Sequence, residues 1–180
     1  MMRRIASLAA AMLAVVPGIA NAAAPNCLTA GEFASLMQFA LPSVINGATQ
    51  RCTQALPASA FLRRQGPALA ARYGEGRAAS WPEAKAAFLK MSANDKGQGA
   101  DLIRAMPDPP MQQMLLGIVE GMVSSQLPLA QCGTADRIVG LLAPLPVQNT
   151  AELIGMLVEL GTAKDSAAAG KVGSLNICRA

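Results

Sequence analysis

Motifs that begin helices recur along this sequence, whereas runs of β-branched residues joined by tight turns do not. Capping boxes occur at residues 29–32, 80–83 and 149–152, where a polar residue is followed three positions later by glutamate. Apolar residues at the spacing of one helical face follow each box. The sequence therefore predicts an all-α fold, a compact orthogonal or bundle-like array of about six to seven short helices. The alternative is an α+β fold with a short hairpin near Val172 to Ile177.

Proline residues divide the predicted helices. A helix that starts at Ala30 should end near Leu41, because Pro42 disfavours helical backbone at the residue before it, and a second helix then covers residues 43–56. Further helices are predicted over residues 60–73, 81–91, 109–126, 135–142 and 151–160, with a shorter candidate at 101–106. The segment 109–126 is apolar over most of its surface, which favours a position in the middle of the bundle. Within it, Gly117 and Gly121 predict close packing against a neighbouring helix.

The first 22 residues have the pattern of an export signal. Arg3 and Arg4 supply a positive start, residues 5–16 are almost purely apolar, and residues 20–22 form a small-residue cleavage motif. The apolar run is shorter than the ~20 residues of a membrane-spanning helix. We therefore expect residues 1–22 to be removed, which leaves one helical domain over residues 23–180, with a flexible segment at 163–174 and no membrane span. A periplasmic or secreted location follows.

Four cysteines come after the export signal: Cys27, Cys52, Cys132 and Cys178. An even number of cysteines in an oxidising compartment favours two disulfides, and no pair has the CxxC spacing of redox-active thiols. Four cysteines allow three connectivities, which the sequence does not decide. A turn at Pro42 and an antiparallel pair of helices after Cys132 would favour Cys27 with Cys52 and Cys132 with Cys178.

The chain contains no histidine. This excludes hydrolases with a histidine base, zinc sites with histidine ligands and haem held by histidine. Because no other catalytic or metal-binding motif is present, we expect a protein without enzymatic activity, metal or cofactor. Without Arg3 and Arg4, the 15 basic residues become 13, against 11 acidic residues, so the net charge is only +2. This net charge is too small to predict nucleic acid as a partner.

Two groups of residues are candidate binding surfaces. Flexible thioethers line adaptable apolar sites, which predicts an apolar surface for a ligand or partner made of Met111, Met114, Ile118, Met122 and Met156. Positive charge is concentrated in a candidate basic surface made of Arg63, Arg64, Arg72 and Arg77. The simpler interpretations are that the methionines fill a core with few aromatic residues, and that the arginines are a solvated helix surface.

These features favour a protein that acts by binding. We expect an exported, non-enzymatic helical protein that binds another envelope or secreted protein in the periplasm or cell envelope. The alternative is a carrier or sensor of an amphiphile, which holds a lipid or acyl chain in a methionine-lined apolar cavity. A carrier needs an enclosed pocket of roughly 300–1,000 Å³, whereas a packed bundle leaves almost no internal space.

Overall fold

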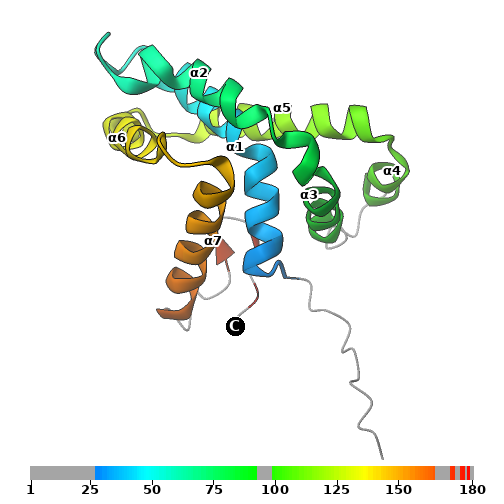
Figure 1. Ribbon diagram of the computed structural model, residues 1–180. Helices are drawn as coiled ribbons and strands as arrows, with labels where there is room; N and C mark the ends of the chain where they lie inside the picture. Colours follow the sequence, from blue (N-terminus) through cyan, green and yellow to red (C-terminus); the bar gives the residue numbers. More distant parts are fainter. Residues whose placement is uncertain (1–26, 93–98, 165–170, 173–174, 177, 179–180) are drawn as a thin grey trace, which may run out of the picture.

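The computed structural model describes residues 27–92, 99–164, 171–172, 175–176 and 178, which form a helical array (Figure 1). The prediction of an all-α fold with two disulfides is confirmed. The helices are α1 (Ala30–Cys52), α2 (Phe61–Gly74), α3 (Arg77–Ser92), α4 (Gly99–Ala105), α5 (Asp108–Gln126), the 3₁₀ helix η1 (Leu129–Gln131), α6 (Cys132–Leu142) and α7 (Val147–Lys164). Two strands of two residues each, β1 (Lys171–Val172) and β2 (Leu175–Asn176), pair antiparallel within the region predicted as the alternative hairpin.

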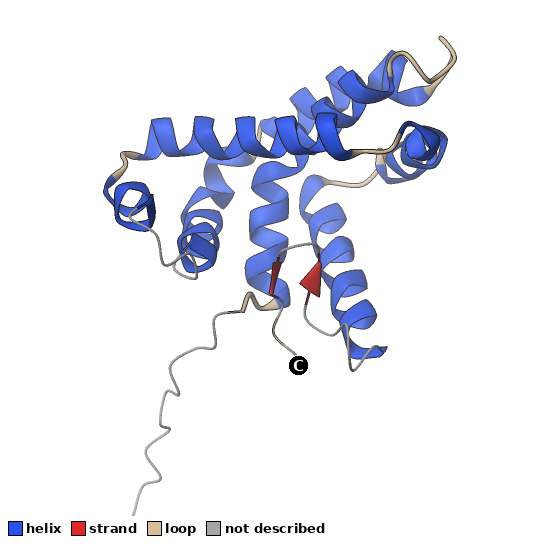
Figure 2. Ribbon diagram, turned by 180° about the vertical axis from the view of Figure 1, so that it is seen from behind, coloured by secondary structure: helices blue, strands red, loops and turns tan. Residues whose placement is uncertain are grey.

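The first helix, α1, lies at the centre of the molecule. It contacts α2, α3, α5 and α7, and Figure 1 shows it between α7 and α3. The expectation that residues 109–126 occupy the middle is wrong, because α5 crosses α1 on one side only and keeps the rest of its surface outside (Figure 2). Small residues allow two helices to pack closely on α1. Gly47 of α1 lets α5 approach one side of this helix, and Gly66 of α2 lies against Thr49 on its other side.

Pro42 lies inside α1 without ending it. The prediction of two helices divided at this proline is therefore wrong. A proline within a helix costs about 3 kcal/mol, because it removes one backbone hydrogen bond and crowds the preceding turn. Packing against four neighbouring helices outweighs this cost, and Pro42 itself is among the fully buried side chains.

Two apolar clusters on α1 form the core. The cluster on its C-terminal half joins α2 and the start of α6 and includes Leu41, Ile45, Ala48, Leu62, Leu69 and Tyr73. The cluster on its N-terminal half joins α3 and the start of α5 and includes Leu28, Phe33, Phe39, Trp81, Phe88 and Met111. The rings of Phe39 and Trp81 lie 4.8 Å apart between centroids. All the aromatic residues of the chain thus lie in the helices that pack directly on α1 or in α1 itself.

The disulfides join Cys27 to Cys178 and Cys52 to Cys132, with Cα atoms 4.9 and 5.4 Å apart. The expectation that all four cysteines pair is confirmed, but the favoured connectivity is wrong. Because α1 continues through Pro42, its 23 residues hold Cys27 and Cys52 at opposite ends of a helix, ~35 Å apart at the α-helical rise. Each cysteine instead meets a partner from a distant segment, and the Cys178 N–H donates to the Leu28 carbonyl at 2.7 Å.

The two ends of the chain fall largely outside the described residues. The predicted export signal at residues 1–22 lies outside them altogether. The predicted flexible segment at 163–174 is only partly described, because α7 runs to Lys164 and β1 begins at Lys171. In the described part of the chain, no helix combines the length and apolar character needed to cross a membrane.

Candidate functional site

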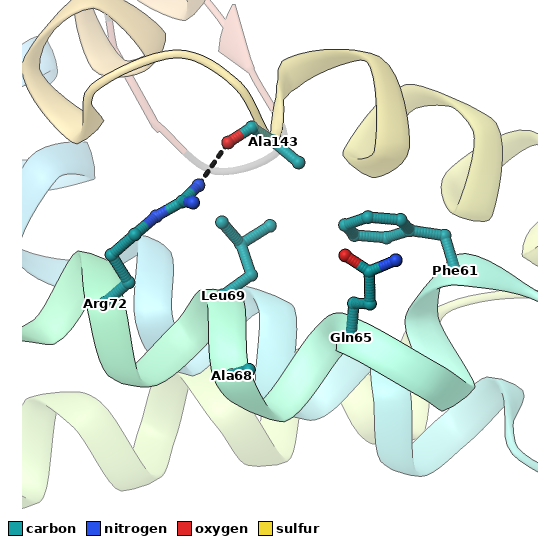
Figure 3. Close-up of a pocket in the computed structure, with 6 residues that line it drawn as sticks. All are labelled: Phe61, Gln65, Ala68, Leu69, Arg72 and Ala143. Atoms are coloured by element: carbon teal, nitrogen blue, oxygen red, sulfur yellow. Dashed lines mark hydrogen bonds between the residues drawn. The ribbon is translucent and has the colours of Figure 1, made fainter.

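A pocket of about 240 Å³ lies between α2 and the end of α6 (Figure 3). Five of its residues come from α2 and one follows α6: Phe61, Gln65, Ala68, Leu69, Arg72 and Ala143. The α2 residues share one face because they are spaced by three, four or seven positions along the helix. Leu69 points into the space between the Phe61 ring and the Arg72 side chain, and Gln65 lies beside the ring. We call this the α2–α6 pocket.

One end of the pocket is held by contacts between α6 and the start of α2. The Asp136 carboxylate of α6 accepts a hydrogen bond from the Leu62 N–H at 2.7 Å, which supplies the cap that α2 lacks in its own sequence. Gly140 lies directly against Phe61, because a Cβ added to this glycine would be 3.4 Å from the aromatic Cγ. The ring of Phe61 is therefore a fixed wall of the pocket.

The other end is held by two side chains at the end of α2. The buried Tyr73 hydroxyl lies 3.1 Å from the Leu142 carbonyl, 3.0 Å from the Leu145 carbonyl and 3.2 Å from the Thr150 hydroxyl. The Arg72 guanidinium donates to the Ala143 carbonyl (Figure 3). These contacts attach the connection between α6 and α7 to α2, so the guanidinium and the apolar walls keep their relative positions.

The four arginines of the predicted basic surface have different environments. Arg63 donates to the Leu56 carbonyl at 2.9 Å, Arg64 is exposed, and Arg72 lines the α2–α6 pocket. Arg77 begins α3 and lies over the Phe39 ring, 5.7 Å from its centroid. Burial lowers the pKa of Arg77 below its ordinary value. The contacts of Arg77 therefore differ from those of the three arginines of α2.

The residues of the predicted apolar surface divide between the core and the exterior. Met111 is fully buried and Met114 packs against the N-terminal core cluster, as the core interpretation expected. Ile118 and Met122 are about half exposed on α5, and Met156 is about half exposed on α7. The structure therefore assigns Met111 and Met114 mainly to packing and leaves Ile118, Met122 and Met156 accessible.

One exposed apolar face was identified from the sequence only through Met156. Met156, Leu157 and Leu160 of α7 are 53%, 59% and 61% exposed, and we call them the α7 outer face. The opposite side of the helix packs inward through Val147, Ala151, Ile154 and Val158. The sequence of α7 carries apolar residues on two sides of the helix. A helix that packs on one side needs only one apolar stripe, so the second stripe could have predicted this exposed face.

A second, shallow pocket of about 270 Å³ adjoins this face. It lies between α1 and α7 and is lined by Ala30, Gly31, Ala34, Glu152, Gly155 and Met156. Gly155 permits the two helices to approach, because an added Cβ would lie 3.3 Å from the Ala30 carbonyl oxygen. Met156 is thus shared between this pocket and the α7 outer face.

An ion pair connects the start of α1 to α3. Lys90 donates to both carboxylate oxygens of Glu32 at 3.0 and 2.8 Å, and Glu32 also accepts from the Thr29 N–H at 2.8 Å. Burial by itself raises the pKa of Glu32, but the hydrogen bonds from Lys90 and Thr29 and the positive charge of Lys90 bring it below its ordinary value. The folded protein therefore favours the ionised carboxylate.

This pKa shift predicts a loss of stability in acid. Since the pKa of Glu32 is lower in the folded than in the unfolded chain, its contribution is complete at neutral pH and disappears as the pH falls below the ordinary value of 4.5. Glu32→Gln should remove this part of the acid destabilisation, about 0.2–1 kcal/mol for a partly exposed ion pair, which thermal unfolding at neutral and acidic pH would measure. Glu83→Gln, at an exposed glutamate outside the ion pairs of the described residues, is the matched control, because it removes one carboxylate and keeps the pair between Lys90 and Glu32.

Comparison with known proteins does not add a functional assignment. No known protein family matches the chain, and neither curated protein sequences nor solved structures show significant similarity to it. Among the described residues, acidic and cysteine side chains do not gather in a group of three or more that could hold a metal ion. The candidate sites are therefore the α2–α6 pocket and the α7 outer face.

Proposed function

We propose that this is an exported, non-enzymatic helical protein that binds another protein in the periplasm or cell envelope through the α7 outer face. The observation that carries the proposal is that Met156, Leu157 and Leu160 are all more than half exposed on one helix. Contiguous exposed apolar residues are a common mark of interaction sites, because their burial against a partner removes apolar area from water.

The disulfides and the residue inventory support the cellular part of this proposal. Two disulfides are compatible with an oxidising compartment such as the periplasm or the exterior. The absence of histidine removes the commonest general base of enzymes. These two features concern the compartment and the reaction class, whereas the α7 outer face concerns how the protein would bind a partner.

The amphiphile carrier has less support. The α2–α6 pocket and the pocket between α1 and α7 have volumes of about 240 and 270 Å³. Both volumes are below the roughly 300–1,000 Å³ of sites that enclose a drug-sized ligand. Of the methionines in the predicted surface, Met156 lines the pocket between α1 and α7, whereas Met111 is fully buried in the core and lines neither pocket.

Paired substitutions on two exposed helix faces test the proposal. A photo-crosslinking residue at Met156 should capture one heterologous envelope protein, and Leu157→Ser with Leu160→Ser should reduce the captured amount roughly tenfold, since apolar anchors dominate interface energies. The matched control is Ile138→Ser with Leu141→Ser on α6, where the side chains are 51% and 73% exposed. Both variants should keep their helical circular dichroism, because exposed positions contribute little to stability.

The contrast between the two faces decides the outcome. Capture that is lost only with the α7 substitutions supports the proposal. Equal capture by both variants would show that the crosslink does not depend on the α7 outer face. Crosslinking only to a second copy of this chain would replace a heterologous partner with self-association.

A further inference from the structure

The α2–α6 pocket combines a positioned positive charge with apolar walls. Arg72 lies at one end, where its guanidinium donates to the Ala143 carbonyl, and Phe61 and Leu69 supply the apolar surface. The stems of arginine side chains pack against apolar groups while the charged end stays accessible. The chemistry of the pocket is therefore amphiphilic, with the charge at one side of an apolar hollow.

The hydrogen-bonding capacity of the pocket is only partly used. Arginine carries several N–H donors in a planar fork, and the contact with Ala143 orients the group without using all of them. None of the ion pairs in the described part of the chain involves Arg72. The acidic residue of α6, Asp136, accepts the hydrogen bond from the Leu62 N–H at the other end of the pocket.

We infer that the α2–α6 pocket binds an apolar carboxylate, with the carboxylate on the Arg72 guanidinium and the apolar group between Phe61 and Leu69. A carboxylate matches the paired N–H groups of a guanidinium, and its small size suits a pocket that is mainly apolar. The volume of about 240 Å³ is too small for a complete drug-sized ligand but accommodates a short aliphatic chain or one amino-acid side chain.

Two sources can supply this chemistry. One is a free short-chain carboxylic acid, and the other is the last residue of a partner protein, where an apolar side chain and the terminal carboxylate occur together. Both place the same groups on the same pocket residues. This inference concerns a different face from the α7 outer face and does not depend on the proposed function.

Four probes separate the contribution of the negative charge from the source of the ligand. The disulfide-bonded protein is titrated with hexanoate and with its uncharged analogue hexanamide. It is also titrated with a short peptide that ends in leucine with a free carboxylate, and with the same peptide amidated at its end. Heteronuclear NMR measures binding in each titration. Hexanoate and the free-carboxylate peptide should bind at least about tenfold more tightly than their uncharged counterparts, because a charge-assisted hydrogen bond is lost in each comparison. Tighter binding of the peptide indicates a protein terminus, and equal or tighter binding of hexanoate indicates a free acid.

Two arginines of α2 provide the matched variants. Arg72→Met keeps the apolar stem but removes the charge, and it should weaken hexanoate binding about tenfold. Arg63→Met removes an exposed arginine that also donates to a backbone carbonyl but does not line the pocket, and it should leave binding unchanged. Ala68→Glu introduces a negative charge one turn from Arg72 at an exposed position and should abolish binding without loss of helical content.

The inference is overturned by any of three results. These are absence of hexanoate and peptide binding, equal affinity for the charged and uncharged probes, and equal losses in the Arg72→Met and Arg63→Met variants. Because Leu157→Ser and Leu160→Ser change a separate face, they should not alter hexanoate binding, so failure of this inference and failure of the proposed function are distinguishable.

Discussion

Replacing Cys52 and Cys132 with alanine should lower the free energy of unfolding by about 4.5 kcal/mol, because the disulfide closes a loop with a sequence separation of 80 residues. This estimate comes from the loop-closure entropy of the unfolded chain. Both cysteines are buried, and alanine avoids placing an unpaired hydroxyl in the core. Chemical denaturation followed by circular dichroism would measure the change.

The helices themselves should survive this substitution, because α2, α3, α5 and α7 still pack against α1. Helical content at neutral pH should therefore stay close to that of the unsubstituted protein, while the denaturation midpoint falls. Addition of a reductant to the unsubstituted protein should reduce stability further than the double alanine variant, since it also opens Cys27–Cys178. A double variant as stable as the unsubstituted protein would contradict the disulfide connectivity.

Gly47→Ala should destabilise the protein by about 1–3 kcal/mol through overpacking where α1 and α5 cross. A Cβ at this position would lie 2.6 Å from the Glu120 carbonyl oxygen and 3.0 Å from the Val123 Cβ. Since one of these atoms belongs to the backbone, the whole α5 helix must move to accommodate the methyl group. Denaturant unfolding of the purified variant would measure the loss.

Gly117→Ala and Gly121→Ala on α5 are the controls for this prediction. An added Cβ at either position meets no heavy atom within 4 Å beyond the local backbone of α5, so the alanine should stabilise the helix by about 0.5–1 kcal/mol. The expectation that Gly117 and Gly121 form a close helix contact is therefore wrong, and Gly47 on α1 makes that contact instead. Destabilisation by the two α5 substitutions, or stability of Gly47→Ala, would contradict the observed crossing of the helices.

Local signals predicted where several helices lie but were less successful with their ends. The box at Thr29 is present, since the Thr29 hydroxyl accepts from the Glu32 N–H at 3.2 Å and Glu32 accepts from the Thr29 N–H. The boxes at Ser80 and Asn149 do not begin helices, because α3 starts at Arg77 and α7 starts at Val147. A capping residue lowers the free energy of a helix end by about 1 kcal/mol, which tertiary packing of one more turn can exceed.

The candidate sites depended more strongly on contacts between distant segments. Arg72 was recognisable as a basic residue, but its place in a pocket depends on Ala143, which lies 71 positions later in the sequence. Met111 and Met156 have the same chemistry, yet one is fully buried and the other is 53% exposed. Side-chain type alone does not decide between these outcomes, because burial depends on which helix lies opposite.

The sequence by itself determined the helical class, the pairing of all four cysteines and the absence of histidine chemistry, because these follow from local periodicity and from residue inventory. The tertiary structure decided the central position of α1, the disulfide partners and the exposed face of α7. Packing on α1 kept the helix continuous through Pro42, and this continuity placed Cys27 and Cys52 too far apart to meet. Long-range packing energy, which no short window of sequence contains, therefore set the topology.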